Sequence, residues 1–148
     1  STTVPITPPQ INRIALGENL RRDSAGQYWE QRVELGMTFD DRALPLSLCW
    51  DVKVNGEKMP WWHWSLRHSA PLPMIYWKSS QNTPSTGCWQ TSSSESLRDE
   101  LFMSIGIQYR DRDWYLPDPY VPRTFQVIAT LTDARGQSVI SPALTFVG

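Results

Sequence analysis

The segment Leu46-Ser47-Leu48-Cys49-Trp50-Asp51-Val52-Lys53-Val54-Asn55-Gly56 indicates most directly how this chain folds. Apolar residues occupy every second position from Leu46 to Val54, and the positions between them are small or polar. This period of two predicts a strand with one buried face, and it places Trp50 in the core. Asn55-Gly56 then predicts a two-residue hairpin turn, because both residue types tolerate a positive φ.

The same alternation recurs on both sides of this segment. Trp29 stands at the start of a further strand, where packing in the core or at an edge is expected. The only helical signal is weak and covers residues 93–101. Many short strands separated by turn residues predict an antiparallel sandwich or barrel. The strands are predicted over residues 10–16, 33–39, 103–109, 125–131 and 138–147, with a turn at 133–136.

A tryptophan-rich stretch lies between the only two cysteines, Cys49 and Cys88. Five of the eight tryptophans fall there, and prolines at 60, 71, 73 and 84 exclude a long helix or a central strand. We therefore expect a long connection over residues 57–90, and a second one over 111–122. Connections of this length are usually functional, or else they fold over the core.

Cys49 and Cys88 are predicted to form a disulfide that holds the two ends of this stretch together. Closing a loop of that length stabilises the fold by roughly 4 kcal/mol in the entropic model. A disulfide implies an oxidising compartment, namely the periplasm, the cell surface or the exterior. The alternative is a pair of unrelated thiols, one buried and one exposed, as in a cytosolic protein.

Composition narrows the class of protein. A chain of 148 residues is suited to one domain, and its net charge of −1 gives no basic stripe for nucleic acid. Its apolar runs are too short for a transmembrane helix, and no signal peptide follows Ser1, so we expect a mature product or an excised domain. Two histidines, no CxxC pair and no catalytic motif predict no metal, no cofactor and no enzymatic activity.

The aromatic residues outside the predicted strands suggest a binding surface. Consecutive indoles at 61, 62 and 64 cannot all face one way in an extended chain. Aromatic and arginine side chains are enriched where proteins bind proteins. The alternative is that this stretch folds back over the domain, and that residues 110–113 form a solvated loop with self-paired charges. The candidate partner-binding residues are Trp61, Trp62, Trp64, Tyr76, Trp77, Trp114, Tyr115 and Arg112.

The closing hairpin, Phe125–Val139 (FQVIATLTDARGQSV), resembles that of bacterial immunoglobulin-like domains in intimin/invasin-type adhesins and export systems. Pro8–Ile14 (PPQINRI) is similar to a first strand that leaves an interdomain linker. The cysteine pair is similar to that of the C-terminal domain of Zir-type secreted exoproteins. The resemblance implies an immunoglobulin-like β-sandwich that binds proteins outside the cell. The tryptophan-rich insertion departs from the family, and the adjacency of Cys49 and Trp50 argues against an antibody-type bond between sheets.

These observations predict an all-β, immunoglobulin-like antiparallel β-sandwich over residues 10–148, preceded by a linker at 1–9 and interrupted by an insertion at about 57–95. The protein is expected to be secreted or on the cell surface, by way of the periplasm. Its expected partner is a secretion partner or a host surface protein, as for an adhesin or a virulence-modulating factor. Two alternatives stay open: a carbohydrate-binding module that uses exposed tryptophan rings, and a purely structural spacer.

Overall fold

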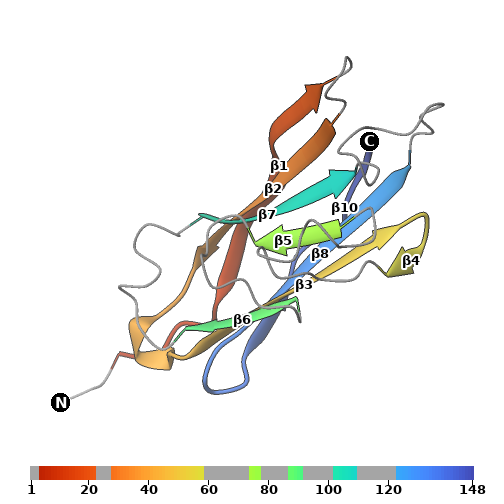
Figure 1. The fold of residues 1–148 in the computed structure, drawn as a ribbon. Coiled ribbons are helices and arrows are strands. Elements are labelled where there is room, and N and C mark those ends of the chain that lie inside the picture. Colours follow the sequence, from red (N-terminus) through yellow and green to blue (C-terminus); the bar gives the residue numbers. More distant parts are fainter. Residues whose placement is uncertain (1–3, 23–27, 59–73, 78–86, 92–101, 110–122) are drawn as a thin grey trace.

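The computed structural model shows an all-β protein whose strands pair in antiparallel fashion (Figure 1). The structure describes residues 4–22, 28–58, 74–77, 87–91, 102–109 and 123–148. Within these residues it has ten strands and one 3-10 turn, η1 (Asp41–Ala43).

One sheet contains four strands in the order β1-β2-β7-β5. β1 and β2 form a long hairpin, β7 pairs with the other side of β2, and β5 pairs with β7 at the far edge. The bounds of these strands are β1 Gln10–Arg22, β2 Tyr28–Thr38, β5 Met74–Trp77 and β7 Phe102–Tyr109.

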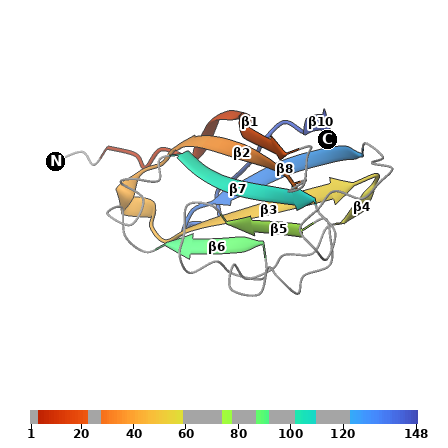
Figure 2. The ribbon, with the colours of Figure 1, turned by 45° about the horizontal axis from the view of Figure 1, so that its top comes forward.

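The second sheet is built around the pair β3 and β8. The other edge of β8 carries β9 and β10, and the other edge of β3 carries β6 and β4 (Figures 1 and 2). The bounds are β3 Leu46–Val54, β4 Glu57–Lys58, β6 Cys88–Thr91, β8 Thr124–Thr132, β9 Ser138–Ile140 and β10 Leu144–Val147.

The core consists of side chains from both sheets. β2 contributes Val33 and Leu35, and every second residue of β3 and β8 is buried. Trp50 is only 3% exposed, which confirms its predicted place in the core. The Phe125 and Phe146 rings stack with their centroids 5.3 Å apart and join β8 to β10. The apolar face predicted from the period of two is therefore the face that the two sheets bury.

The hairpin turn after β3 is the one that the sequence predicts. Asn55 and Gly56 both have positive φ values, 49° and 85°. The Asn55 side chain also accepts a hydrogen bond from the backbone N–H of Thr124, at 3.0 Å. The turn residue therefore ties the β3–β4 hairpin to the start of β8.

The first strand is longer than the predicted range of 10–16, because two bulges let it continue. The register with β2 shifts between Ile11 and Arg13, and again between Leu16 and Asn19. At the second bulge, the buried Gln31 amide donates to the carbonyl of Gly17 at 3.2 Å and accepts from Asn19 at 2.9 Å. Gln31 thus provides a hydrogen-bond donor for backbone carbonyls that have no partner in the interrupted ladder.

The last strand, predicted as one element from Ser138 to Val147, is split into β9 and β10. The pairing with β8 gains one residue between Ile140 and Leu144, which is a β-bulge. The Ser141 hydroxyl accepts a hydrogen bond from the Ala129 N–H at 2.8 Å, and the Ser141 N–H donates to the Ala129 carbonyl. Before the bulge an odd-numbered residue, Val139, packs against the core. After it the alternation is shifted by one residue, so the even-numbered Phe146 is buried.

The stretch predicted as a long connection, residues 57–90, is not a plain loop. It contains β4, β5 and most of β6, which are short strands at sheet edges. The helical segment predicted over 93–101 and the connection predicted over 111–122 lie outside the described residues.

Candidate binding site

β4, β5 and β6 lie on one side of the molecule, which we call the insertion flank (residues 57–58, 74–77 and 87–91) (Figures 1 and 2). β5 is the edge of one sheet, whereas β4 and β6 form the edge of the other. At the opposite side, β1 approaches β9. All three strands of the flank come from the tryptophan-rich stretch or its immediate ends. This stretch therefore supplies an edge of each sheet, on the same side of the molecule.

A disulfide between Cys49 and Cys88 fastens the insertion flank to β3, as the sequence predicts. The two residues lie directly opposite each other on neighbouring strands, with their Cα atoms 4.1 Å apart. The backbone N–H of Trp50 donates to the carbonyl of Gly87 at 2.8 Å, just beyond the cysteine pair. The bond therefore lies within one sheet, and it does not cross the core between the sheets.

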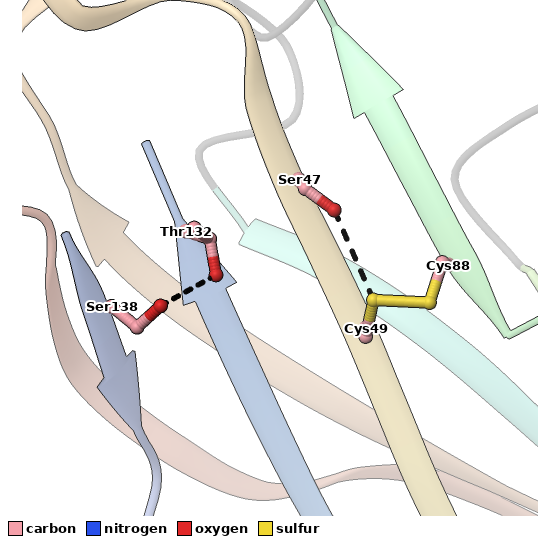
Figure 3. Close-up of a disulfide and its surroundings, with 5 residues drawn as sticks. All are labelled: Ser47, Cys49, Cys88, Thr132 and Ser138. Atoms are coloured by element: carbon pink, nitrogen blue, oxygen red, sulfur yellow. Dashed lines mark hydrogen bonds between the residues drawn. A yellow bond between two sulfur atoms is a disulfide. The ribbon is translucent and has the colours of Figure 1, made fainter. Parts of the chain in front are cut away.

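The disulfide lies on the outer face of its sheet. Cys49 shares that face with Ser47, whose hydroxyl lies 3.9 Å from the Cys49 sulfur, and Cys88 is exposed. Beside it, the hydroxyls of Thr132 and Ser138 are 2.8 Å apart (Figure 3). Small hydroxyl side chains from three adjacent strands thus lie next to the disulfide on this face.

Two of the tryptophans close to the cysteines face inward. Trp50 is buried, and Trp89, on β6 opposite Leu48, is half-buried and packs against the core. The alternation along β6 therefore sends Cys88 outward and the next residue inward. These two indoles belong to the scaffold that carries the flank.

The structure places the predicted site residues as follows. It brings Cys49 and Cys88 together. Tyr76 and Trp77 lie in β5, where their backbones pair with Gly106 and Ile105 of β7. The other predicted partner-binding residues lie outside the described residues: Trp61, Trp62, Trp64, Arg112, Trp114 and Tyr115.

A second polar cluster, which the sequence analysis did not identify, lies at the end of the domain where the chain enters. Arg42 donates to the carbonyl of Val4 at 2.8 Å and to that of Pro5 at 3.2 Å. Arg135, in the β8–β9 turn, donates to the carbonyl of Ile6 at 3.2 Å. We call this arrangement the arginine clamp (Arg42 and Arg135 on residues 4–6).

Each arginine of the clamp is oriented by an aspartate two residues before it. Asp40 accepts hydrogen bonds from the backbone N–H and the guanidinium of Arg42, at 3.0 and 2.7 Å. Asp133 accepts from the N–H of Arg135 at 2.9 Å and from its guanidinium at 3.2 Å. The same Asp-x-Arg turn therefore occurs twice, and its side chains meet on one backbone segment.

Both aspartates are held in the ionised form. The side-chain hydrogen bond from Arg42 is the main reason that the pKa of Asp40 lies far below its usual range. Burial acts to raise the pKa of Asp133, but hydrogen bonds from Gln137 and Arg135 lower it overall. Neither carboxyl group can donate a proton near neutral pH, so the geometry suits a structural role better than acid–base chemistry.

A hollow of about 360 Å³ lies beside the arginine clamp, lined by Thr7, Pro8, Thr38, Phe39, Asp40 and Asp41. The Asp40 carboxylate in this lining already forms an ion pair with Arg42. Among the described residues, no group of three His, Cys, Asp or Glu side chains is placed to hold a metal ion. In the same part of the chain, no helix combines the length and apolar character that a membrane crossing requires.

No protein-family model, curated protein or solved structure matches this chain.

Proposed function

We propose that the chain is an immunoglobulin-like β-sandwich that binds a protein partner outside the cytoplasm, as a module of a bacterial adhesin or exported factor. The strand order supports the fold. Immunoglobulin domains have strands A-B-E-D in one sheet and G-F-C in the other. The orders β1-β2-β7-β5 and β10-β8-β3 are the same if the strands are lettered along the chain with β4, β6 and β9 left out as additional short strands.

Trp50 supports the same assignment. A buried tryptophan on strand C is a hallmark of immunoglobulin domains, and Trp50 is buried on β3, the strand in that position. In antibody domains this tryptophan packs on a disulfide between the two sheets. Here the disulfide joins β3 to β6 within one sheet, which makes it a fastening for the insertion flank.

The Cys49–Cys88 bond is the observation that carries the functional proposal. It anchors both ends of a tryptophan-rich stretch to a rigid sheet, on a face that is turned away from the core. A covalent bond between the two ends of a segment restricts its conformations in advance and so lowers the entropic cost of binding. A disulfide also supports an extracytoplasmic location, because thiols in the cytosol are kept reduced.

Binding is tested with immobilised panels of purified extracellular host proteins and of glycans. We expect saturable binding to a protein, with loss of at least tenfold in affinity for Trp61→Ala/Trp64→Ala, which are chosen from the sequence. The matched control, Leu16→Ala/Ile140→Ala, truncates exposed apolar residues away from the insertion flank and is expected to bind normally.

Four results contradict the proposal. Binding to a sugar with quenching of tryptophan fluorescence would identify a carbohydrate-binding module instead. Unchanged protein binding by the tryptophan variant would place the site elsewhere, and its unfolding would assign these indoles to the core. Free thiols at Cys49 and Cys88 in the untreated natural protein, detected by mass spectrometry, would contradict the extracytoplasmic location.

A further inference from the structure

The outer edge of β10 carries backbone groups that no strand of the described residues pairs with. Arg123 and Gly148 exchange two backbone hydrogen bonds, of 2.8 and 3.0 Å, so they form a hydrogen-bonded pair of the β8–β10 ladder. Such pairs recur at every second residue of an antiparallel ladder, here at Phe146 and Leu144. The N–H and C=O groups of the residues between them, Thr145 and Val147, therefore point away from β8.

The side chains along this edge do nothing to protect it. Thr145 is exposed and Val147 is 68% exposed. Sheet edges are usually protected by charged residues, prolines or bulges. The bulge and Pro142 protect the chain before Leu144, but residues 143–148 contain no charged side chain and no proline.

Two other edges of the protein are protected in the usual way. β1 carries two bulges and the exposed Arg13, which forms an ion pair with Glu34. β4 consists of Glu57 and Lys58, both exposed. Unlike β1 and β4, β10 thus combines open hydrogen-bonding groups with neutral, exposed residues.

We propose that β10 pairs with β10 of a second copy of this chain and forms a weak symmetric dimer. The edge is self-complementary. With a two-fold axis at Phe146, Thr145 faces Val147 of the partner subunit, and Val147 faces Thr145 of the partner subunit. Four backbone hydrogen bonds form, and one antiparallel sheet runs through both copies.

The low charge of the chain favours a second copy as the partner of β10, and the small contact area makes the dimer weak. The segment brings no charged side chain to the axis, and the whole chain has a net charge of only −1, so repulsion between two copies is weak. A contact between two short strands buries less than the roughly 1,200 Å² of a standard interface. We therefore expect a dissociation constant in the high micromolar range. This dimer uses the side of the molecule opposite the insertion flank, so it does not depend on the proposed function.

Amide hydrogen exchange tests the proposal residue by residue, with the intact chain. In dilute solution the amides of Leu144 and Phe146 are expected to exchange slowly and those of Thr145 and Val147 quickly. At high micromolar concentration the latter two are expected to slow at least several-fold. If their exchange is independent of concentration, β10 does not pair with a second copy.

Sedimentation velocity over the same concentrations provides the second test. Thr145→Pro removes an outward N–H without touching the β8 ladder, and it is expected to abolish the dimer. Thr145→Val keeps the N–H and is expected to dimerise like the wild type. If Thr145→Pro does not fold, Val147→Lys places two like charges at the axis, with Val147→Thr as its control. A wild type that stays monomeric, or edge variants that dimerise normally, would overturn the proposal.

Discussion

Loss of the Cys49–Cys88 disulfide is expected to lower the stability of the fold by a calculable amount. The perturbation is Cys49→Ser/Cys88→Ser, which is suited to this site because the bond lies on the outer face and Cys88 is exposed. Serine therefore opens no cavity in the core. What the variant removes is the covalent closure of the chain between β3 and β6.

The magnitude follows from the length of the closed loop. The two cysteines are 39 residues apart. The chain-entropy relation then gives about 13 cal/mol/K, or about 4 kcal/mol at 25 °C, of stabilisation through the unfolded state. For a chain of this size the expected decrease in melting temperature is on the order of 10 °C. With a urea m-value of about 2 kcal/mol/M, the midpoint is expected to fall by about 2 M.

The assay is equilibrium urea unfolding followed by tryptophan fluorescence, which reports on the buried Trp50. The wild type is measured oxidised and reduced, beside the double serine variant. Ser47→Ala is the matched control, because it removes the hydroxyl next to the Cys49 sulfur and leaves the loop closed. Its free energy of unfolding is expected to change by no more than about 0.5 kcal/mol.

Coincident midpoints for the oxidised wild type and the double serine variant would refute this reasoning. They would mean that the unfolded chain gains no freedom when the bond is absent. A loss as large as 4 kcal/mol in Ser47→Ala would also refute it, because the stabilisation would then come from local contacts and not from loop closure.

Three further changes are expected to affect stability for different reasons, each measured by the same unfolding assay. Ser141→Ala leaves the buried N–H of Ala129 without its acceptor and is expected to cost about 1–3 kcal/mol, whereas Ser138→Ala, at an exposed site, is expected to cost far less. Gly56→Ala meets open space but must keep a φ of 85°, so a loss of about 1 kcal/mol is expected, and no loss would show that the turn changes its conformation. Because the folded-state pKa of Asp133 is lowered, its contribution is present above the unfolded value of 3.8 and is lost as the pH falls below it. Asp133→Asn is accordingly expected to weaken the loss of stability as the pH falls below about 4, and an unchanged acid limb would contradict the assignment.

The strands that the sequence predicted best are those with an unbroken alternation. β3 has the predicted bounds, Leu46–Val54, and β8 extends the predicted range by one residue at each end. Both strands pair on two sides and bury one face completely, so their pattern reflects a single environment along the whole length. The Asn55-Gly56 turn was predictable for a local reason, since few residue types adopt its backbone conformation.

The bulges could not be predicted in the same way. Whether Ser141 begins a bulge depends on the register of β8, which is a property of two strands and not of one. β5 and β6 have four residues each, too few for a period of two to stand out. The cysteine pairing was predictable from the count of cysteines, but its position within one sheet required the pairing of β3 with β6.

The arginine clamp left a signal that the sequence analysis did not use. Asp40-Asp41-Arg42 and Asp133-Ala134-Arg135 share the pattern Asp-x-Arg, and in both the aspartate accepts the N–H two residues later. The repetition is visible in the sequence. Its meaning is not, because residues so far apart converge only once β8 lies beside β3 and its turn reaches η1, where Ala134 donates to the carbonyl of Ala43.

The clamp has a consequence for how this protein can vary. The hydrogen bonds that Arg42 and Arg135 donate to residues 4–6 go to backbone carbonyl oxygens, and Val4 is 72% exposed. Carbonyl oxygens are the same in every residue, so the grip is indifferent to which amino acids occupy these positions. The entry segment is therefore free to diverge between related proteins without changing its path, whereas the two Asp-x-Arg turns are not. Among natural variants, the arginines should persist where the residues they hold have changed.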